Sequence, residues 1–270
     1  MATKKVRKKV GLALGSGGIR GLAHVGVIRS LLDNNIPIDY IAGCSIGAWV
    51  AAHYALYNDL EKLSEFTVGK KQEKLRSFLE ISLEGGLIKG KKLETLLDDW
   101  LDHKTFADIK TPLKVNAVDV LTGREIIFDS GSLGHAVRTS MSIPGIFRPI
   151  KENGMMLVDG GICNPVPDNI VREMGADVVI SVNLDDFRSE KPYAESDMSI
   201  TGITARMIEI MRHYLALNSL QSSDVIIMPP VAKYSNWREY FWNNAGEDIA
   251  RVGVETTEKL IPTIRNLIAS

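Results

Sequence analysis

A serine between two glycines is the pattern in this chain with the clearest chemical meaning. Ser45 lies in a G-x-S-x-G motif with Gly43 and Gly47, directly after the apolar run Tyr40–Ala42 and before an alanine-rich, helix-like segment. A strand that turns sharply into a helix presents such a serine as a nucleophile, and glycines on both sides avoid clashes within the turn. The N-terminus of the helix behind it favours negative charge. The motif predicts nucleophilic attack by Ser45, and the alternative is a surface turn with a helix-capping serine.

A glycine-rich turn nearer the N-terminus could supply a second part of such a site. Residues 15–21 read Gly-Ser-Gly-Gly-Ile-Arg-Gly and connect an apolar run to a helix-like one. Bare N–H groups in such a turn bind an anion, either a nucleotide phosphate or the oxyanion of a tetrahedral intermediate. The spacing gives neither G-x-G-x-x-G nor G-K-[ST], so a nucleotide is the weaker interpretation. Arg20 could face the anion, or it could be an exposed arginine at the start of a helix.

An aspartate followed by two glycines ends another apolar run. Asp159, Gly160 and Gly161 come directly after 156–158, Met-Leu-Val. The carboxyl end of a strand lies at the edge of the sheet where α/β proteins bind their ligands, and the glycines permit a sharp turn. Asp159 is therefore a candidate catalytic carboxylate, and the alternative is an ordinary Asp-Gly β-turn.

The elements that must position these residues alternate between strand-like and helix-like segments. Runs such as Val178–Val182 are apolar throughout, which favours a sheet covered on both faces. Strands are expected over Val10–Leu14, Tyr40–Ala42, Leu113–Val120, Glu125–Phe128, Met155–Val158, Asp177–Leu184 and Asp224–Met228. Helices are expected over Gly21–Leu32, Ser45–Leu56, 59–82, Leu93–Leu101, Leu133–Met141, Pro167–Met174, 200–220 and 246–268. This alternation predicts an α/β fold, a three-layer α/β/α sandwich with a mostly parallel central sheet.

Composition and charge narrow the classes of function. The chain has 270 residues, of which 45% are hydrophobic and 24% charged, as in an ordinary soluble globular protein. Its net charge of −1 gives no reason to expect a nucleic-acid partner. Cys44 and Cys163 cannot form a disulfide framework and indicate a reducing compartment, and the histidines offer no metal site. We expect a cytoplasmic protein that needs no metal and no organic cofactor.

The chain is expected to form one domain behind a short leader. Residues 1–9 contain five basic residues and predict a flexible leader, which could be attracted to the anionic inner face of a membrane. The segment that follows is too short and too rich in glycine for a signal peptide, and no apolar stretch reaches 18 residues. Residues 10–270 then form the domain, with Asp185–Ser199 as its most weakly ordered stretch.

Taken together and in this order, the three motifs resemble those of the patatin-like phospholipase family. Residues 140–149 and 164–167 also resemble family signatures, and the likeness covers residue 10 to about 185. The resemblance implies a patatin-like fold and a serine hydrolase that cleaves lipid esters through an acyl-enzyme, without a cofactor. It assigns Ser45 as the nucleophile and Asp159 as the general base of a catalytic dyad. It also assigns the oxyanion hole to the N–H groups of Gly17 and Gly18, with Arg20 beside them.

Two other functions remain open on the residues themselves. A Ser-Asp-His triad requires a histidine after the acid, and only His213 follows Asp159, in a helix-like segment that favours a helix face. A non-catalytic, lipid-responsive binding or regulatory module could share the fold, although such a module has no need of a nucleophile turn. One position departs from the family, because Ser16 stands where glycine is usual. Its backbone N–H is retained, and its hydroxyl could crowd or assist the oxyanion hole.

Two apolar clusters in the C-terminal third bear on a lipid substrate. Met207, Met211 and Leu215 recur at helical spacing, which favours a packed core face over a lipid-binding one. The aromatic-rich segment 234–242 fits the mouth of an acyl pocket or an interfacial anchor, and equally a wedge beneath the last helix. Residues 59–101 are the expected cover of an acyl groove beside the nucleophile.

Overall fold

A mixed β-sheet forms the centre of the molecule in the computed structural model, which describes residues 7–67, 91–186, 199–234 and 245–269. Within these ranges the sheet has eight strands in the order β5-β6-β3-β2-β1-β7-β8, with β4 paired to β3. The strands are β1 Val10–Leu14, β2 Tyr40–Gly43, β3 Leu113–Asp119, β4 Arg124–Phe128, β5 Ile150–Glu152, β6 Met155–Asp159, β7 Val178–Val182 and β8 Val225–Ile227.

The parallel part of the sheet places the glycine-rich turn at its centre. Strands β3, β2, β1, β7 and β8 pair in parallel, and β4, β5 and β6 add antiparallel pairs beyond β3. The chain leaves β1 toward β2 on one side and returns with β7 on the other. The carboxyl end of β1 is therefore a topological switch point, where open α/β sheets bind ligands.

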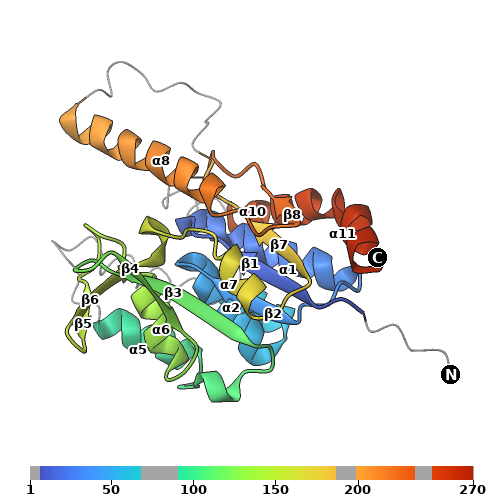
Figure 1. Ribbon diagram of the computed structural model, residues 1–270, viewed down its shortest axis with the longest axis horizontal. Helices are drawn as coiled ribbons and strands as arrows, with labels where there is room; N and C mark the ends of the chain where they lie inside the picture. The colour runs from blue at the N-terminus through green and yellow to red at the C-terminus, as the bar shows by residue number, and fades with distance from the viewer. Residues whose placement is uncertain (1–6, 68–90, 187–198, 235–244, 270) are drawn as a thin grey trace.

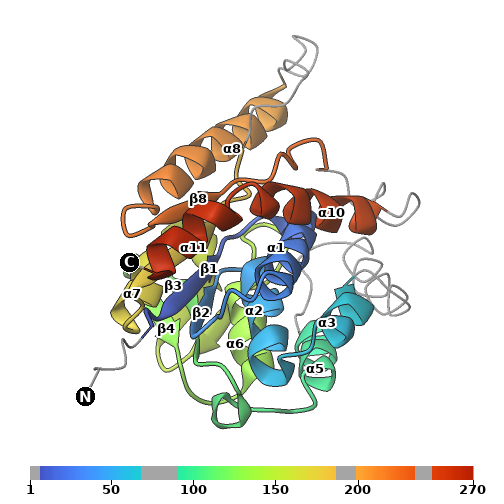
Figure 2. The same cartoon turned by 90° about the vertical axis from the view of Figure 1, so that its right-hand side faces the viewer.

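Helices cover both faces of the sheet, and this confirms the predicted α/β sandwich (Figures 1 and 2). Leu12 and Leu14 pack into a large core with α1, α2 and α10, whereas Ala13 points to a smaller cluster beneath α7. Such alternation follows from the two-residue period of a strand. The helices are α1 Ala23–Asp33, α2 Ile46–Tyr57, α3 Leu60–Thr67, α5 Lys91–Trp100, α6 Leu133–Ser140, α7 Asp168–Glu173, α8 Ile200–Asn218, α10 Ala245–Glu258 and α11 Ile261–Ala269.

Several expected elements differ from the structure. The single helix expected over 246–268 is two helices, because the chain turns after α10 and Pro262 stands in the first turn of α11, where its missing N–H costs nothing. Strand β5 was not predicted. The expected helix over 59–82 is present as α3, and the remainder lies outside the described residues, as do 187–198 and 235–244.

Candidate active site

The carboxyl ends of β2 and β6 meet along β3, and this brings two of the motifs together. Strand β2 runs parallel to β3 and places Gly43 opposite Val115. Strand β6 runs antiparallel and places Asp159 opposite Ala117. The two strands therefore end toward each other, so that the turn after β2, which carries Ser45, faces the last residue of β6.

The turn around Ser45 has the strained geometry of a nucleophile elbow. Ser45 has φ 55° and ψ −122°, a left-handed conformation that is rare for a residue with a side chain. A Cβ on Gly43 would lie 2.4 Å from the Gly47 carbonyl oxygen, and a Cβ on Gly47 would lie 2.2 Å from the Leu14 carbonyl oxygen. The Ser45 N–H donates to Ser140 Oγ at 2.8 Å. With 4% of its surface exposed, Ser45 does not fit the alternative of a surface turn.

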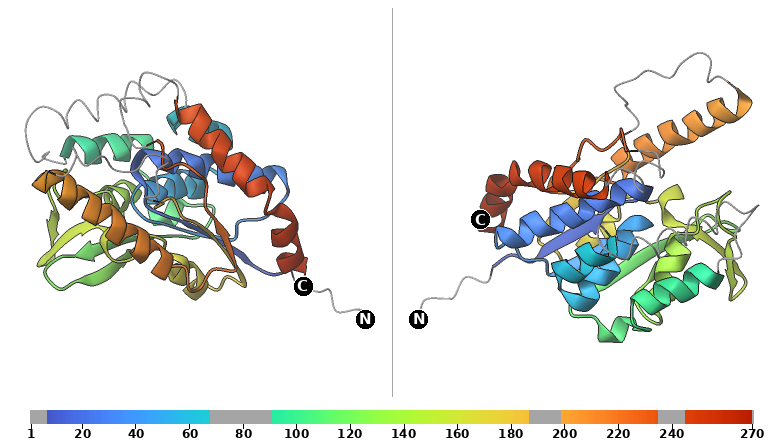
Figure 3. Two further views of the ribbon diagram at one scale, coloured as in Figure 1. Left: turned by 90° about the horizontal axis from the view of Figure 1, so that it is seen from above. Right: turned by 180° about the vertical axis from the view of Figure 1, so that it is seen from behind.

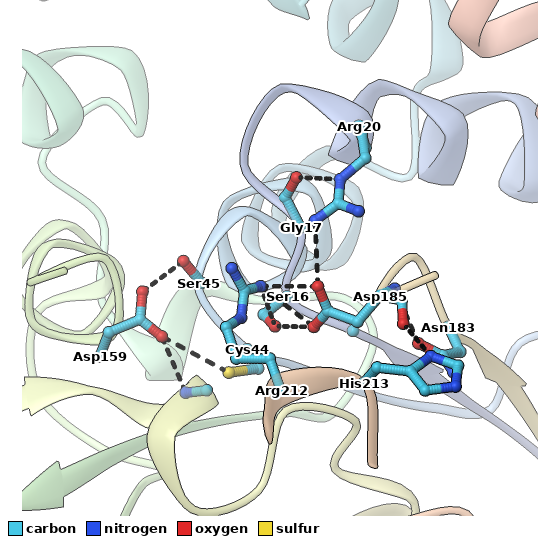
Figure 4. A network of polar contacts seen from close by, with 12 residues as sticks. Ser16, Gly17, Arg20, Cys44, Ser45, Asp159, Asn183, Asp185, Arg212 and His213 are labelled. Carbon is cyan, nitrogen blue, oxygen red and sulfur yellow. Dashed lines mark hydrogen bonds and ion pairs between the residues drawn. The ribbon is translucent and has the colours of Figure 1, made fainter. Parts of the chain in front are cut away.

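Ser45 and Asp159 are in direct contact (Figure 4). Ser45 Oγ donates to Asp159 Oδ2 at 2.5 Å, and Asp159 Oδ1 accepts from the Gly161 N–H at 2.8 Å, in a short turn that begins at Gly160. Burial raises the pKa of Asp159 to about 6, although the bonds from Ser45 and Gly161 lower it. A carboxylate with a pKa near neutrality that accepts a hydroxyl proton is arranged as a general base.

The glycine-rich turn after β1 contains backbone N–H groups that have no hydrogen-bond partner among the described residues. The N–H groups of Gly15 and Ser16 donate to neighbouring carbonyls within the molecule. The chain then changes direction at Gly18, which has φ 57° and starts the 3-10 turn Gly18–Leu22. In the described part of the chain, no hydrogen bond is recorded for the N–H groups of Gly17 and Gly18. These two groups are available to an oxyanion.

A buried carboxylate that the sequence did not reveal holds this turn in place. Asp185 accepts hydrogen bonds from Ser16 Oγ at 3.0 Å, from Arg20 at 3.0 Å and from Arg212 at 2.7 Å (Figure 4). Arg20 also donates to the Gly17 carbonyl at 3.1 Å. The Arg20 side chain is 16% exposed, so it is not an exposed helix-start residue, and its guanidinium joins the turn to Asp185.

Two buried histidines contact backbone carbonyls in the same region. His24 Nε2 lies 2.8 Å from the Gly15 carbonyl, and burial lowers the pKa of His24 to about 4, so a neutral ring donates this bond. His213 lies on the inner side of α8, and its Nδ1 is 2.7 Å from the Asp185 carbonyl. This agrees with the expected helix-face position of His213.

Asp185 and Arg212 are the functional candidates that the sequence interpretation missed. Asp185 was assigned to the weakly ordered stretch 185–199, whereas it is 5% exposed and thus buried. The sequence did contain a signal that Asp185 could belong to the site, because it follows the carboxyl end of a parallel strand, as ligand-binding residues often do. Arg212 gave no such signal, since its partners Asp185 and Ser16 lie 27 and 196 residues away.

Other chemistry is not indicated within the described ranges. No three or more His, Cys, Asp or Glu side chains there gather as they would around a metal ion. Both cysteines are free thiols, and burial raises their pKa values. None of the described helices combines the length and the apolar character needed to cross a bilayer.

Residues 12–170 match the family model described as Patatin-like phospholipase. The chain belongs to the patatin-like phospholipase family. The matched region contains all three motifs, from the turn after β1 to the turn after β6, so the predicted membership is confirmed.

Curated relatives of this patatin-like protein are longer than the chain. An uncharacterized NTE family protein of Mycobacterium bovis is 34% identical over 177 residues, which are 65% of this chain and 49% of that protein. Lysophospholipase NTE1 of Pyricularia oryzae is 30% identical over 209 residues, 76% of this chain and 14% of that protein. The chain thus spans about half or less of the length of these relatives.

Solved structures share the patatin-like fold at low sequence identity. VipD from Legionella pneumophila superimposes with a TM-score of 0.58 at 14% identity, over 95% of this chain and 67% of that one. The type III effector protein ExoU gives a TM-score of 0.51 at 14% identity, over 97% of this chain and 54% of that one. These likenesses concern the fold.

Proposed function

We propose that this protein is a serine lipid acyl hydrolase that cleaves carboxylic esters through a Ser45–Asp159 dyad. The observation that carries the proposal is the 2.5 Å hydrogen bond from Ser45 Oγ to Asp159 Oδ2, within a strained turn at a helix N-terminus. A triad histidine is not needed to activate the serine, because the carboxylate itself receives the hydroxyl proton.

Acylation of the enzyme uses three groups. Ser45 Oγ attacks the ester carbonyl carbon and gives its proton to Asp159. The carbonyl oxygen becomes an oxyanion and accepts hydrogen bonds from the N–H groups of Gly17 and Gly18. When the bond between the carbonyl carbon and the leaving oxygen breaks, Asp159 returns the proton to that oxygen. An alcohol departs, and the acyl group stays on Ser45 as an ester.

Hydrolysis of the acyl-enzyme uses Asp159 in the same way, with water as the nucleophile and Ser45 Oγ as the leaving group. Water attacks the acyl carbon and gives a proton to Asp159, and the oxyanion again occupies the donors of Gly17 and Gly18. The bond to Ser45 Oγ then breaks, the fatty acid leaves, and Asp159 reprotonates the serine. Arg20 acts indirectly in this scheme, because it fixes the carbonyl of Gly17 and ties the turn to Asp185.

The substrate class follows from the family and not from the dyad, which is compatible with many esters. Membership of the patatin-like phospholipase family supports a lipid ester, and a relative named lysophospholipase supports a glycerophospholipid with one acyl chain. We propose such a lipid at the inner face of a membrane, with the protein cytoplasmic and peripheral.

A panel of esters tests this function. Purified protein is mixed with nitrophenyl esters of increasing chain length and with phospholipid and lysophospholipid in detergent micelles, and released fatty acid is measured. The parent protein should exceed Ser45→Ala by about 10³-fold or more on at least one acyl ester, as expected for loss of a nucleophile. Rates equal to those of Ser45→Ala on every ester would instead favour a non-catalytic, lipid-responsive module.

His213→Ala separates the dyad from a triad. The dyad predicts that most of the activity remains, because His213 contacts the Asp185 carbonyl on the inner side of α8. A loss of about 10³-fold or more, comparable to that of triad members, would assign His213 a catalytic role. Circular dichroism of the variant shows whether any smaller loss reflects a change in folding.

A further inference from the structure

The outer side of α8 is a continuous apolar stripe. Ile200, Ile203, Met207, Met211 and Tyr214 are 86%, 49%, 52%, 62% and 63% exposed. Their spacing of three or four residues places them along one side of the helix. We call these five residues the α8 stripe. The expectation that Met207 and Met211 belong to a packed core face is wrong, because both are exposed.

The opposite side of α8 is anchored to the active site at the C-terminal end of the helix. At 100° per residue, His213 and Ala216 lie roughly opposite the α8 stripe, and both are buried. Arg212, on the same inner half, donates to Asp185 and to Ser16 Oγ beside the oxyanion donors. The helix projects from the body of the molecule in several views (Figures 1 and 3). The α8 stripe is thus an outward-facing surface on an element that touches the glycine-rich turn.

We propose that the α8 stripe docks on a lipid bilayer, with the helix lying in the plane of the membrane interface. The inference rests on the proposed function, because an enzyme acting on a bilayer lipid must hold its nucleophile close to the bilayer surface. The contacts of Arg212 fix α8 to the turn that receives the oxyanion. Docking through α8 would therefore fix the distance between this turn and the membrane surface.

Two further exposed apolar residues support the choice of a lipid surface. Ile162 follows Gly161 directly and is 46% exposed, and Ile146, in the segment after α6, is 47% exposed. An exposed isoleucine in the turn directly after Asp159 suits contact with acyl chains. The five residues of the α8 stripe are uncharged, so attraction between opposite charges does not drive docking through this surface.

The size of the surface disfavours a second protein molecule as its occupant. Stable protein interfaces take about 20–30 residues from each partner, whereas the whole of α8 has 19 residues, and some of these are buried. An interfacial helix needs no complementary partner surface, because its apolar side enters only the headgroup and upper acyl region of the bilayer. The α8 stripe is sufficient for a lipid surface and small for a dimer.

Vesicle binding by a catalytically inactive protein tests the proposal. The full chain with Ser45→Ala is mixed with uncharged phosphatidylcholine vesicles, and bound protein is measured by sedimentation. The test variant adds Ile203→Gln, Met207→Gln and Met211→Gln, which remove apolar surface while glutamine keeps a good helix propensity. The matched control adds Ile226→Gln on β8, because Ile226 is an exposed isoleucine, 41% exposed, outside α8. Thermal unfolding of each protein reports folding.

The proposal predicts that the Ser45→Ala protein binds the vesicles, that the Ile226→Gln control binds equally, and that the triple variant binds at least about tenfold more weakly. It is overturned if the Ser45→Ala protein does not bind, or if the triple variant binds as well as the control. A dimer that the triple variant converts to a monomer would also overturn it, in favour of a second copy of the chain. Because the assay needs no turnover, its outcome is independent of the test of hydrolysis.

Discussion

The two sides of the active site are built in different ways. On the dyad side, Ser45 and Asp159 stand at the ends of two strands, and the sheet itself brings them together. On the oxyanion side, the donors of Gly17 and Gly18 lie in a turn that the side chain of Asp185 holds from a distant strand end. Backbone topology positions the proposed reacting groups, and a buried ion cluster positions the proposed oxyanion donors.

This difference predicts two kinds of variant. A change on the dyad side removes a participant in proton transfer and leaves the framework intact. A change in the ion cluster leaves every reacting atom present but loosens the turn that presents the oxyanion donors. The first kind is expected to abolish the reaction, and the second to slow it while also lowering stability.

Asp159→Asn is expected to have the largest effect on activity. The amide keeps the shape of the carboxylate and can still accept from the Gly161 N–H, but it cannot take the proton of Ser45. We expect kcat on a short-chain nitrophenyl ester to fall by about 10³-fold or more, as for removal of a triad member. Less than about tenfold loss in folded protein would show that Asp159 is not the base.

Asp185→Asn is expected to have a smaller effect on kcat. It removes the negative charge that Arg20 and Arg212 share, so the turn at Gly17 loses its support. We expect kcat to fall by about 10- to 100-fold, with a smaller change in KM, because oxyanion stabilisation acts in the transition state.

Asp224→Asn is the matched control for Asp185→Asn. Asp224 also forms an ion pair with an arginine, Arg172, at 2.6 Å, and its carboxylate accepts a hydrogen bond from the Val179 N–H. Val179 lies near the start of β7, away from the strand ends that carry the dyad. This control should lose stability and keep its kcat. Equal losses of kcat in both variants would show that the Asp185 effect is general destabilisation.

The dependence of activity on pH tests the proposed role of Asp159 as the general base. Asp159 accepts a proton only as a carboxylate, and burial raises its pKa to about 6. Activity should therefore be lost as the pH falls through about 6, with kcat/KM dropping about tenfold per pH unit below it. Initial rates on a neutral ester measure this profile. His213→Ala should keep the same profile, and its disappearance in that variant would point to a histidine base.

The smallest expected effect is a gain of stability in Asp159→Asn. The pKa of Asp159 is raised from 3.8 to about 6 in the folded protein, so the folded state holds a proton that the unfolded state has released between these values. Stability therefore falls as pH rises through this window and stays lower above it. A shift of about two pKa units corresponds to about 3 kcal/mol.

Urea unfolding of Asp159→Asn and the parent protein measures this effect. The variant should be more stable by up to about 3 kcal/mol at about pH 8, and the difference should vanish toward about pH 4. A variant that is less stable than the parent at about pH 8 would show that the carboxylate contributes to folding as well as to chemistry.

The turns of the dyad side could be predicted from the sequence because their signals are local. Glycines beside Ser45 and after Asp159, each following an apolar strand, mark turns whose positions the mixed sheet then determines. The family resemblance added the roles, and membership of the family is confirmed. The pairing of these two residues as a working dyad remains a prediction, which the contact between them supports.

The oxyanion side was predicted only in part because its supports are distant in the chain. Asp185 and Arg20 are 165 residues apart, and charged residues in a polar segment give no sign of burial. The prediction that Met207 and Met211 on α8 belong to a packed core face was wrong for a related reason. Helical periodicity shows that apolar residues share a face, but it does not show whether that face is packed or exposed.

Labelling with a fluorophosphonate tests the central claim most directly. The reagent reacts with an activated serine, so the parent protein in detergent should be labelled on Ser45, as located by mass spectrometry of its peptides. Ser45→Ala should not be labelled, and Asp159→Asn should be labelled far more slowly, because its serine has no base. Absence of label on Ser45 in folded parent protein, or label on a different serine, would contradict a Ser45–Asp159 hydrolase.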